Sequence, residues 1–516
     1  MDLSHLRTLC ADLQTSLLNT ARLRHLFFAL AAYAGIAFSA TAQTLTNQWT
    51  DSLTGSYAGS TQLAPSIPVG WGYMDPMVAM IGSDQYAPLF HNCNVENEAL
   101  VDEMNHVDDR PYRYCIYLVK NGDVVSNLVD MATFGLGTEP SPPNRRHAYQ
   151  PPMLFAHDGK IFMAYWVYTP GTGSVIQLLK FDPANPPGWT VVSTYNSGSA
   201  GLNYLGGAMS AGGDIVIAGY SQTSGLQTLL AVKTSPPYTT WQTPQIVTQY
   251  TTVAHTPLYP HVAIKDDDKI SILAVLHNGT SCGSNVWTAY KNVVVYEGYY
   301  GSPINALWSD ASGDVVIDPN YAGDNCYYNA QRFPLDHFYD PASDAVYSIV
   351  RSQELTAGYD LSDSVQDKMA ANAPYTRTFK LYKDGALIHG NLASLFSSYF
   401  ADTNQGGTAI DSMSMTRLSN GEFVIFANSR GPGASGGSAW TWQNIGVTWS
   451  SDLSTFATPQ YLTTSFGAGH AVKVAQPAKN GSGTISTLDF FTSGNLYNPS
   501  DIYHSHQYTY RHYTLN

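Results

Sequence analysis

The apolar residues of this chain fall into short runs that are separated by turn residues. Residues 151 to 195 show this most clearly, because four runs follow one another there: PPMLFAHD, KIFMAYWVY, SVIQLLKFDP and WTVVSTY. The first two are joined at His157, Asp158 and Gly159, a sequence typical of a tight hairpin turn. A helical period is absent over any useful length, except around residues 361 to 372. The pattern predicts an all-β protein.

Groups of such runs recur along the chain with a period of roughly 45 to 70 residues, as in the blades of a β-propeller. Further groups fall at about 205–249, 260–318, 337–388 and 412–463, with one starting near Tyr73 and a last one from His470 to the C-terminus. The sequence therefore predicts a seven-bladed β-propeller of four-stranded antiparallel blades. A two-sheet sandwich or a jelly roll would not explain the repeat.

The N-terminal segment has the features of an export signal. Arg22 and Arg24 precede the apolar run LFFALAAYAGIAF, and Ala40-Thr41-Ala42 follows as a cleavage pattern. We expect a signal peptide at 1–42 and a single β-propeller domain at 43–516, in a protein that is secreted, periplasmic or displayed at the cell surface. An N-terminal strand within 43–60 would complete the last blade, as in many propellers. Beyond the signal, no apolar stretch is long enough to cross a bilayer.

Composition and charge narrow the functional class. Only 12% of residues are charged while 35 are Tyr, which is typical of an extracellular β-protein, and the formal net charge of −14 argues against a nucleic-acid partner. An acidic sugar remains compatible, because one focused Arg binds a carboxylate. The four Cys of the mature chain form an even set for an oxidising compartment. Proximity favours the pairs Cys93–Cys115 and Cys282–Cys326.

One segment resembles a known motif. The stretch VTWSSDLSTFATPQ (447–460) resembles the Asp-box, an S-x-D-x-x-x-T-W turn between the outer strands of sialidase-like blades, with Phe456 in place of the Trp and no Gly at the fifth position. Weaker echoes occur at 234–245 and 307–319. The mature chain as a whole resembles the BNR-repeat seven-bladed propellers, which include sialidases and secreted polysaccharide lyases such as ulvan lyases and rhamnose–glucuronate lyases. The Asp-box is structural, so it implies fold and not activity.

Chemically active side chains occur where strand ends are expected to meet. In a blade the first strand runs along the central channel and the second returns, so residues just before the first strand and at the end of the second share a face. Before the first strands come Tyr73, Asp75, His147, Tyr149, Asn203, Tyr204, His255, Tyr259, His261, Tyr327, Tyr328, Arg332, Asp411 and His470. At the ends of the second strands come Tyr168, Tyr220, His277, Arg351 and Arg430.

This mixture of His, Tyr and Arg suits β-elimination from a uronic acid, and the lyases that the chain resembles are similar in using such residues. An Arg neutralises the sugar carboxylate through bidentate hydrogen bonds, a base removes the adjacent proton, and an acid protonates the departing oxygen. We expect Arg332 or Arg351 as the neutraliser, His255 or His261 with His277 as the base region, and Tyr204 or Tyr328 as the acid. The expected substrate-binding residues are His147, Tyr149, Tyr168, Asn203, Tyr220, Tyr259, Arg430 and His470.

Two other classes compete with the lyase. A sialidase needs three Arg, which Arg332, Arg351 and Arg430 would supply, but the usual early F/Y-R-I-P motif is missing. Hydrolysis by two carboxylates has only Asp75 and Asp411 available on the expected face. A non-catalytic propeller would use the same aromatic side chains to hold a glycan.

Metal binding has little support in the sequence. Neither H-x-x-x-H nor C-x-x-C occurs, and the acidic run Asp266-Asp267-Asp268 reads as a solvated turn, with structural Ca²⁺ as a minor alternative and Zn²⁺ at an axial His cluster as another. No cofactor is therefore assigned. The expected partner is a polysaccharide or oligosaccharide, and the protein is expected to be a monomer.

Overall fold

The computed structural model describes most of the chain between residues 45 and 515. The described residues are 45–53, 78–92, 114–130, 152–198, 201–309, 330–355, 375–396, 401–430, 442–463, 470–477, 487–496 and 506–515, with short gaps at 122, 170–172, 224, 252–255, 279–280, 283–284, 287–288, 403–406, 409 and 419. The chain divides into two compact units, residues 1–46 with 515–516 and residues 47–514. The sheets below are described within the second unit; the proposed signal peptide lies outside the described residues.

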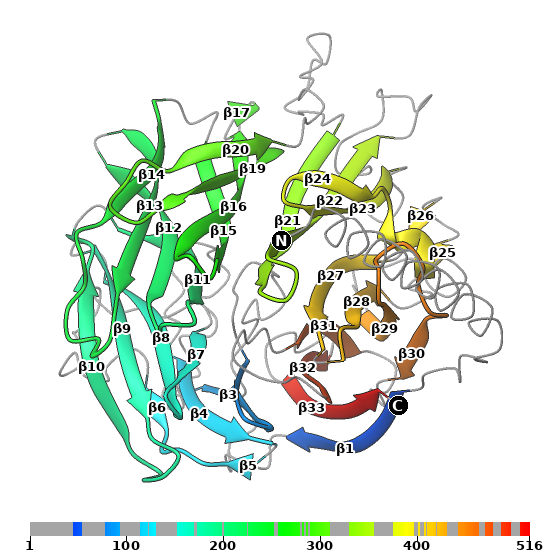
Figure 1. The fold of residues 1–516 in the computed structure, drawn as a ribbon, viewed down its shortest axis with the longest axis horizontal. Coiled ribbons are helices and arrows are strands. Elements are labelled where there is room, and N and C mark those ends of the chain that lie inside the picture. Colours follow the sequence, from blue (N-terminus) through cyan, green and yellow to red (C-terminus); the bar gives the residue numbers. More distant parts are fainter. Residues whose placement is uncertain are drawn as a thin grey trace, which may run out of the picture. The chain divides into compact units, whose positions relative to one another are not determined.

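The second unit is an all-β propeller whose blades follow one another along the chain (Figure 1). Each blade is named here by its strands. Blade β7–β10 consists of β7 (Met153–His157), β8 (Lys160–Thr169), β9 (Gly173–Phe181) and β10 (Trp189–Asn196). Blade β11–β14 consists of β11 (Asn203–Met209), β12 (Ile215–Thr223), β13 (Leu226–Thr234) and β14 (Gln245–Tyr250). Blade β15–β20 consists of β15 (Thr256–Ile264), β16 (Lys269–Asn278), β19 (Ala289–Tyr299) and β20 (Asn305–Ser309).

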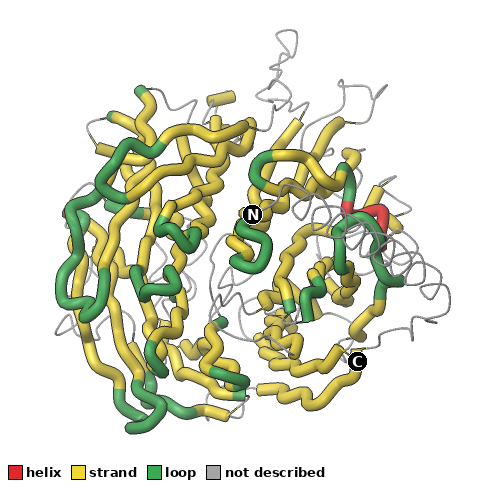
Figure 2. The backbone as a smooth tube through the Cα atoms, in the orientation of Figure 1, coloured by secondary structure: helices red, strands yellow, loops and turns green. Residues whose placement is uncertain are grey.

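The later blades repeat this order. Blade β21–β24 consists of β21 (Ala330–Asp340), β22 (Ala345–Leu355), β23 (Tyr375–Lys383) and β24 (Ala386–His389). Blade β27–β30 consists of β27 (Ile410–Arg417), β28 (Phe423–Arg430), β29 (Trp442–Ser450) and β30 (Gln460–Thr463). Two short hairpins, β17 (Ser281–Cys282) with β18 (Asn285–Val286) and β25 (Ala401–Asp402) with β26 (Gly407–Thr408), lie outside these sheets. Strands and loops make up nearly all of the described chain, and η6 (Leu392–Phe396) is its one named helical segment (Figure 2).

The two ends of the chain contribute to one sheet, the terminal blade. Its strand order is β1 (Leu45–Leu53), β33 (His506–Leu515), β32 (Thr487–Leu496) and β31 (His470–Pro477). The N-terminal strand therefore lies beside the C-terminal strand (Figure 1). This confirms the expectation that a strand within 43–60 completes the last blade, and it covers an edge of β33 that would otherwise expose unpaired backbone groups.

The prediction of seven four-stranded blades is wrong. The described chain instead forms six four-stranded antiparallel blades. The remaining large sheet has five: β2 (Ala79–Ile81), β3 (Asp84–Asn92), β4 (Tyr114–Lys120), β5 (Asp123–Val124) and β6 (Val129–Asp130), of which β5 and β6 both pair with β4. The physical reason lies at Ser126, whose Oγ accepts a hydrogen bond from the Leu118 backbone N at 2.7 Å. A side chain thus takes the place of a backbone acceptor and interrupts the outer strand.

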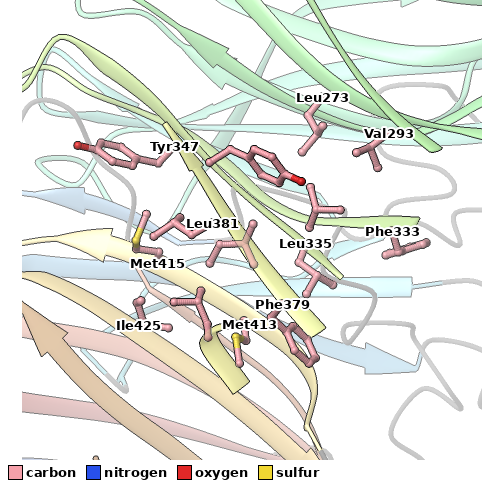
Figure 3. Packing of buried hydrophobic residues seen from close by; sticks show 14 of the residues in the cluster. Leu273, Val293, Phe333, Leu335, Tyr347, Phe379, Leu381, Met413, Met415 and Ile425 are labelled. Atoms are coloured by element: carbon pink, nitrogen blue, oxygen red, sulfur yellow. The ribbon is translucent and has the colours of Figure 1, made fainter. Parts of the chain in front are cut away.

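Neighbouring blades are held together by apolar side chains that fill the space between their sheets. Figure 3 shows Leu273 of β16 and Val293 of β19 in one buried cluster with Phe333 of β21, Leu381 of β23 and Met415 of β27. These side chains come from three blades in succession, and each is at most 7% exposed. Full burial of such a side chain contributes about 1.5–3 kcal/mol. Successive side chains of a strand point to opposite faces of its sheet, so each blade contributes side chains to two interfaces, one with each neighbouring blade.

Buried polar contacts fix how these blades align. Asp336 of β21 is 1% exposed and accepts a hydrogen bond at 2.6 Å from the backbone N of Met415 in the next blade. His337 lies between two hydroxyl groups, with Nδ1 2.8 Å from Ser348 Oγ of its own blade and Nε2 3.0 Å from Ser271 Oγ of the preceding one. Directional contacts of this kind specify an alignment that apolar packing alone leaves loose.

The segment that resembles an Asp-box forms a tight turn between the outer strands β29 and β30. Ser450 Oγ accepts from Leu453 N at 2.8 Å and donates to Thr455 O at 2.6 Å. The Asp452 carboxylate accepts from Thr455 N at 2.9 Å and Ser454 N at 2.8 Å, and these backbone hydrogen bonds lower the pKa of Asp452. Phe456 packs against the buried cluster between blades. The substitution of Phe for Trp therefore keeps an aromatic ring in the core.

Gly206 permits the first strands of two neighbouring blades, β11 and β15, to approach each other closely. A Cβ atom at Gly206 of β11 would overlap the carbonyl oxygen of Pro260 in β15. We expect Gly206→Ala to lower the free energy of unfolding by about 2 kcal/mol, as for other overpacked interiors. Denaturant unfolding measures it. Gly188→Ala is the control, because nothing lies within 4 Å of the Cβ position there; equal stability of the two variants would contradict the steric argument.

Candidate active site

The strand register places the sequence-predicted ends of first and second strands opposite each other. Asn203 at the start of β11 pairs with Tyr220 near the end of β12. In the next blade Thr256 pairs with His277, and in the one after it Phe333 pairs with Arg351. Each of three successive blades therefore carries at least one sequence-predicted residue in these pairs: Asn203 and Tyr220 in the first, His277 in the second and Arg351 in the third.

Two tyrosines of this region adopt an unusual backbone conformation. Tyr204 has φ of 53° and Tyr259 has φ of 52°, and each lies where its first strand breaks register with the second. Residues other than glycine rarely adopt positive φ, and such strain is concentrated at functional sites. The two rings contact each other edge to face, with centroids 4.8 Å apart and an interplanar angle of 73°. The bulges thus turn both rings toward the boundary between two blades.

The aromatic contacts continue into a third blade and end at a cation. The Tyr259 ring lies 5.3 Å from the Phe333 ring, and the guanidinium carbon of Arg351 lies 5.3 Å from the centroid of that ring. Tyr259 and Phe333 are buried, whereas Arg351 is partly exposed. A guanidinium group that stacks on a ring keeps its planar N–H edge in a defined direction. The ring contact thus limits the orientations that the Arg351 guanidinium can adopt.

A hydrogen-bonded group lies at the same corner of the blades on the other side of Tyr204. Tyr220 donates its hydroxyl proton to Gln227 Oε1 at 2.5 Å, and the Thr256 hydroxyl donates to the same oxygen at 3.4 Å. Burial, together with the nearby Tyr204, raises the pKa of Tyr220. Tyr220 therefore stays protonated at neutral pH.

His277 lies opposite Thr256 near the end of β16. Burial lowers the pKa of His277 to about 4. Its imidazole is consequently neutral at physiological pH and can accept a proton.

These residues are called the strand-end cluster: Tyr204, Tyr220, Gln227, Thr256, Tyr259, His277, Phe333 and Arg351. The cluster offers a neutral imidazole, phenol hydroxyls, one fixed guanidinium and an aromatic wall. None of these eight residues is an Asp or a Glu. The combination suits an anionic, oxygen-rich ligand and a proton transfer that begins from a neutral base.

The other predicted residues are placed differently. His261 lies inside β15, opposite Leu273, and is only 1% exposed, so it is a less accessible base candidate than His277. Asn203 is partly buried at the start of β11. Four further candidates lie in strands whose side chains are not described at these positions, namely Tyr168, Arg332, Arg430 and His470. His147, Tyr149, His255 and Tyr328 lie outside the described residues.

Three cluster members are not among the sequence-predicted residues: Gln227, Thr256 and Phe333. Gln227 is the second residue of β13, the third strand of its blade. The start of the third strand lies at the same end of the blade as the end of the second, so the third strand also contributes side chains there. Phe333 has no polar group that would mark it as chemically active in the sequence.

The described residues test the metal and disulfide predictions only in part. In that part of the chain no three His, Cys, Asp or Glu side chains gather as a metal site would require. At the acidic turn, Asp267 accepts a hydrogen bond from the Tyr299 hydroxyl at 2.8 Å, which lowers the pKa of Asp267. Cys115 and Cys282 lie in β4 and β17, whereas Cys93 and Cys326 are outside the described residues, so both pairings stay predictions.

None of the helices in the described part of the chain is long and apolar enough to cross a lipid bilayer.

The comparisons with known proteins give weak likenesses to propellers that act on carbohydrates. No family model matches the chain, and no curated protein matches it. Among solved structures, an ulvan lyase of polysaccharide lyase family PL25 bound to GlcA(1-4)Rha3S units is similar with a TM-score of 0.49 and 9% identity, over 92% of this chain and 96% of that one. The polysaccharide lyase Uly1 has a TM-score of 0.43 and 9% identity, over 91% and 100% of the two chains. The α-L-arabinofuranosidase Arb93A from Fusarium graminearum has a TM-score of 0.39 and 13% identity, over 72% and 95%.

The lowered pKa of His277 predicts a pH dependence of stability. In the folded protein this pKa is about 4, against an ordinary value of 6.5 in the unfolded chain. Below about pH 6.5 the unfolded chain therefore binds a proton that the folded protein does not, and the free energy of unfolding falls until about pH 4, by roughly 3 kcal/mol. His277→Gln should lose less stability than the wild type over this window. Denaturant titrations at pH 8 and pH 4.5 measure the difference, and equal losses would contradict the burial argument.

Proposed function

We propose that this protein is a secreted polysaccharide lyase that cleaves a uronate-containing glycan by β-elimination. The observation that carries the proposal is the strand-end cluster, in which a neutral imidazole, tyrosine hydroxyls and a stacked guanidinium occupy corresponding corners of three successive blades. The export signal and the even set of cysteines support secretion.

Arg351 is the proposed partner of the uronate carboxylate. A uronate gains an acidic proton beside its carboxylate only when the negative charge is neutralised, and a planar guanidinium does this through two parallel hydrogen bonds. The contact of Arg351 with the Phe333 ring supports this role, since it limits the orientations of the planar guanidinium group. Arg332 stays an alternative, because its side chain is outside the described residues.

His277 is the proposed base. Its neutral imidazole takes the proton from C5 of the uronate, the electron pair forms the C4–C5 double bond, and the C4–oxygen bond breaks. A pKa of about 4 keeps the imidazole in the neutral form that can accept a proton. Tyr204 is the proposed acid that protonates the departing oxygen, with the ring fixed by Tyr259.

A glycan-binding propeller without catalysis is the second candidate. It is favoured by the ring contacts among Tyr204, Tyr259 and Phe333, which would serve sugar stacking equally well. A two-carboxylate glycoside hydrolase, of either stereochemical type, receives no support from the strand-end cluster. A sialidase-like site would need Arg430 beside Arg332 and Arg351.

A substrate panel separates these functions. We expect the protein to release an unsaturated uronate product, seen as new ultraviolet absorbance, from at least one of ulvan, pectin-like and glucuronate-rich polymers. A hydrolase would instead release reducing ends without that absorbance, and a binding protein would retain the polymer without releasing either. Reducing ends without absorbance, or retention alone, would contradict the lyase.

Single substitutions test the assigned roles on the polymer that is cleaved. His277→Ala and Tyr204→Phe should each lower kcat by roughly 10²–10⁴-fold, because each group acts as the proton moves. Arg351→Lys keeps the charge but loses the fork, and should lower kcat/KM by at least about tenfold. Tyr299→Phe is the matched control, since its hydroxyl binds Asp267 at the opposite end of the β15–β16 hairpin. Wild-type kcat in all of the site variants would place the active site elsewhere.

A further inference from the structure

Gln227 is buried within the strand-end cluster, and its carboxamide is held in one orientation. It is 1% exposed, and its Oε1 accepts from two hydroxyl groups, those of Tyr220 and Thr256. The two bonds come from different blades, so the amide lies at the boundary between β11–β14 and β15–β20. With Oε1 fixed in this way, Nε2 is directed away from both hydroxyls.

The Nε2 group has no acceptor among the described residues. A buried donor without an acceptor costs roughly 1–3 kcal/mol, and such groups are uncommon in folded proteins. Tyr220, which donates to Gln227 Oε1, is partly exposed. An oxygen atom of a ligand that reached Nε2 would relieve this cost.

A second tyrosine–glutamine pair provides the comparison within the same chain. In blade β7–β10 the Tyr165 hydroxyl donates to Gln177 Oε1, and the Nε2 of Gln177 likewise has no acceptor among the described residues. Tyr165 and Gln177 are both completely buried. The pair is thus a repeated structural feature of the blades, and only at Gln227 does it reach a partly exposed corner that also holds an imidazole.

We propose that Gln227 binds the glycan, with Nε2 donating a hydrogen bond to a hydroxyl or carboxylate oxygen of the sugar while Oε1 positions Tyr220 and Thr256. The class of ligand rests on the proposed function. The assignment of the donor rests on the hydrogen bonds and burial of Gln227 itself.

Two substitutions separate donation to the sugar from support of the fold. Gln227→Glu keeps an acceptor for Tyr220 and Thr256 but replaces the donor with a negatively charged oxygen. Gln227→Met removes the donor and the acceptor together. Affinity is measured by calorimetry with size-selected ulvan oligosaccharides, and product formation is followed in parallel by ultraviolet absorbance.

We expect Gln227→Met to weaken binding about fivefold to tenfold, and Gln227→Glu to weaken it more than tenfold, since it places like charges together. Gln249→Glu makes the same charge change at an exposed position of β14 and should bind as the wild type does. Gln177→Met matches the loss of a buried tyrosine–glutamine bond and should change stability without changing affinity.

The two roles are distinguished by which of the two variants binds the glycan more weakly. If Gln227 only supports the fold, Gln227→Glu binds as the wild type and Gln227→Met is the weaker, which would overturn the inference. Should Gln227→Glu fail to fold, unchanged affinity of Gln227→Met would overturn it equally. Wild-type binding without product would count against the lyase and leave the inference standing if the variants weaken that binding. Absence of binding by the wild type would overturn both.

Discussion

Apolar packing between the faces of neighbouring sheets is the constraint on which the rest of this structure depends. No blade carries the strand-end cluster by itself: Tyr204, Tyr259 and Phe333 come from three blades, and their rings meet only because those sheets pack closely. Gly206 shows how close the approach is, since a single methyl group there would overlap the backbone at Pro260. The geometry of the proposed site is therefore a consequence of how the blades pack, and a change in that packing far from the site would be felt within it.

The proposed site places one cation among neutral side chains in a strongly acidic chain. The chain carries a formal net charge of −14, whereas the eight named residues of the strand-end cluster include one Arg and neither Asp nor Glu. Burial rather than a neighbouring charge sets the protonation of His277, and it contributes most to that of Tyr220. A local environment of this kind favours an anionic ligand at one place on a protein that repels anions elsewhere. Selectivity for an acidic sugar would then come from the position of the Arg351 guanidinium and not from electrostatic attraction by the protein as a whole.

Much of the strand order follows from the sequence, because alternating apolar runs and turn residues are local signals. The four runs at 151–195 match β7 to β10, and the strand expected within 43–60 is β1. The prediction of the blades was wrong where a single side chain changes the strand pairing. The Leu118 backbone N donates to Ser126 Oγ in place of a backbone oxygen, and the hydrophobic pattern of the sequence does not reveal such a contact. Within the site, His277 and Tyr220 were predicted because they lie near the ends of second strands. The burial of His261 and the hydrogen bonds of Gln227 were not predicted, because they depend on β-bulges and on contacts between blades. Such contacts are long-range and leave no pattern in a single sequence.

The terminal blade links the two ends of the molecule, with β33 between the first strand and the rest of that sheet. Because β1 precedes β33 by more than 450 residues, a chain that emerges from the ribosome N-terminus first holds β1 without its neighbour until β33 has been synthesised. The sheet therefore closes late, after the strands of the other blades have emerged. The same order means that a break in the chain beside β1 or beside β33 weakens one and the same sheet.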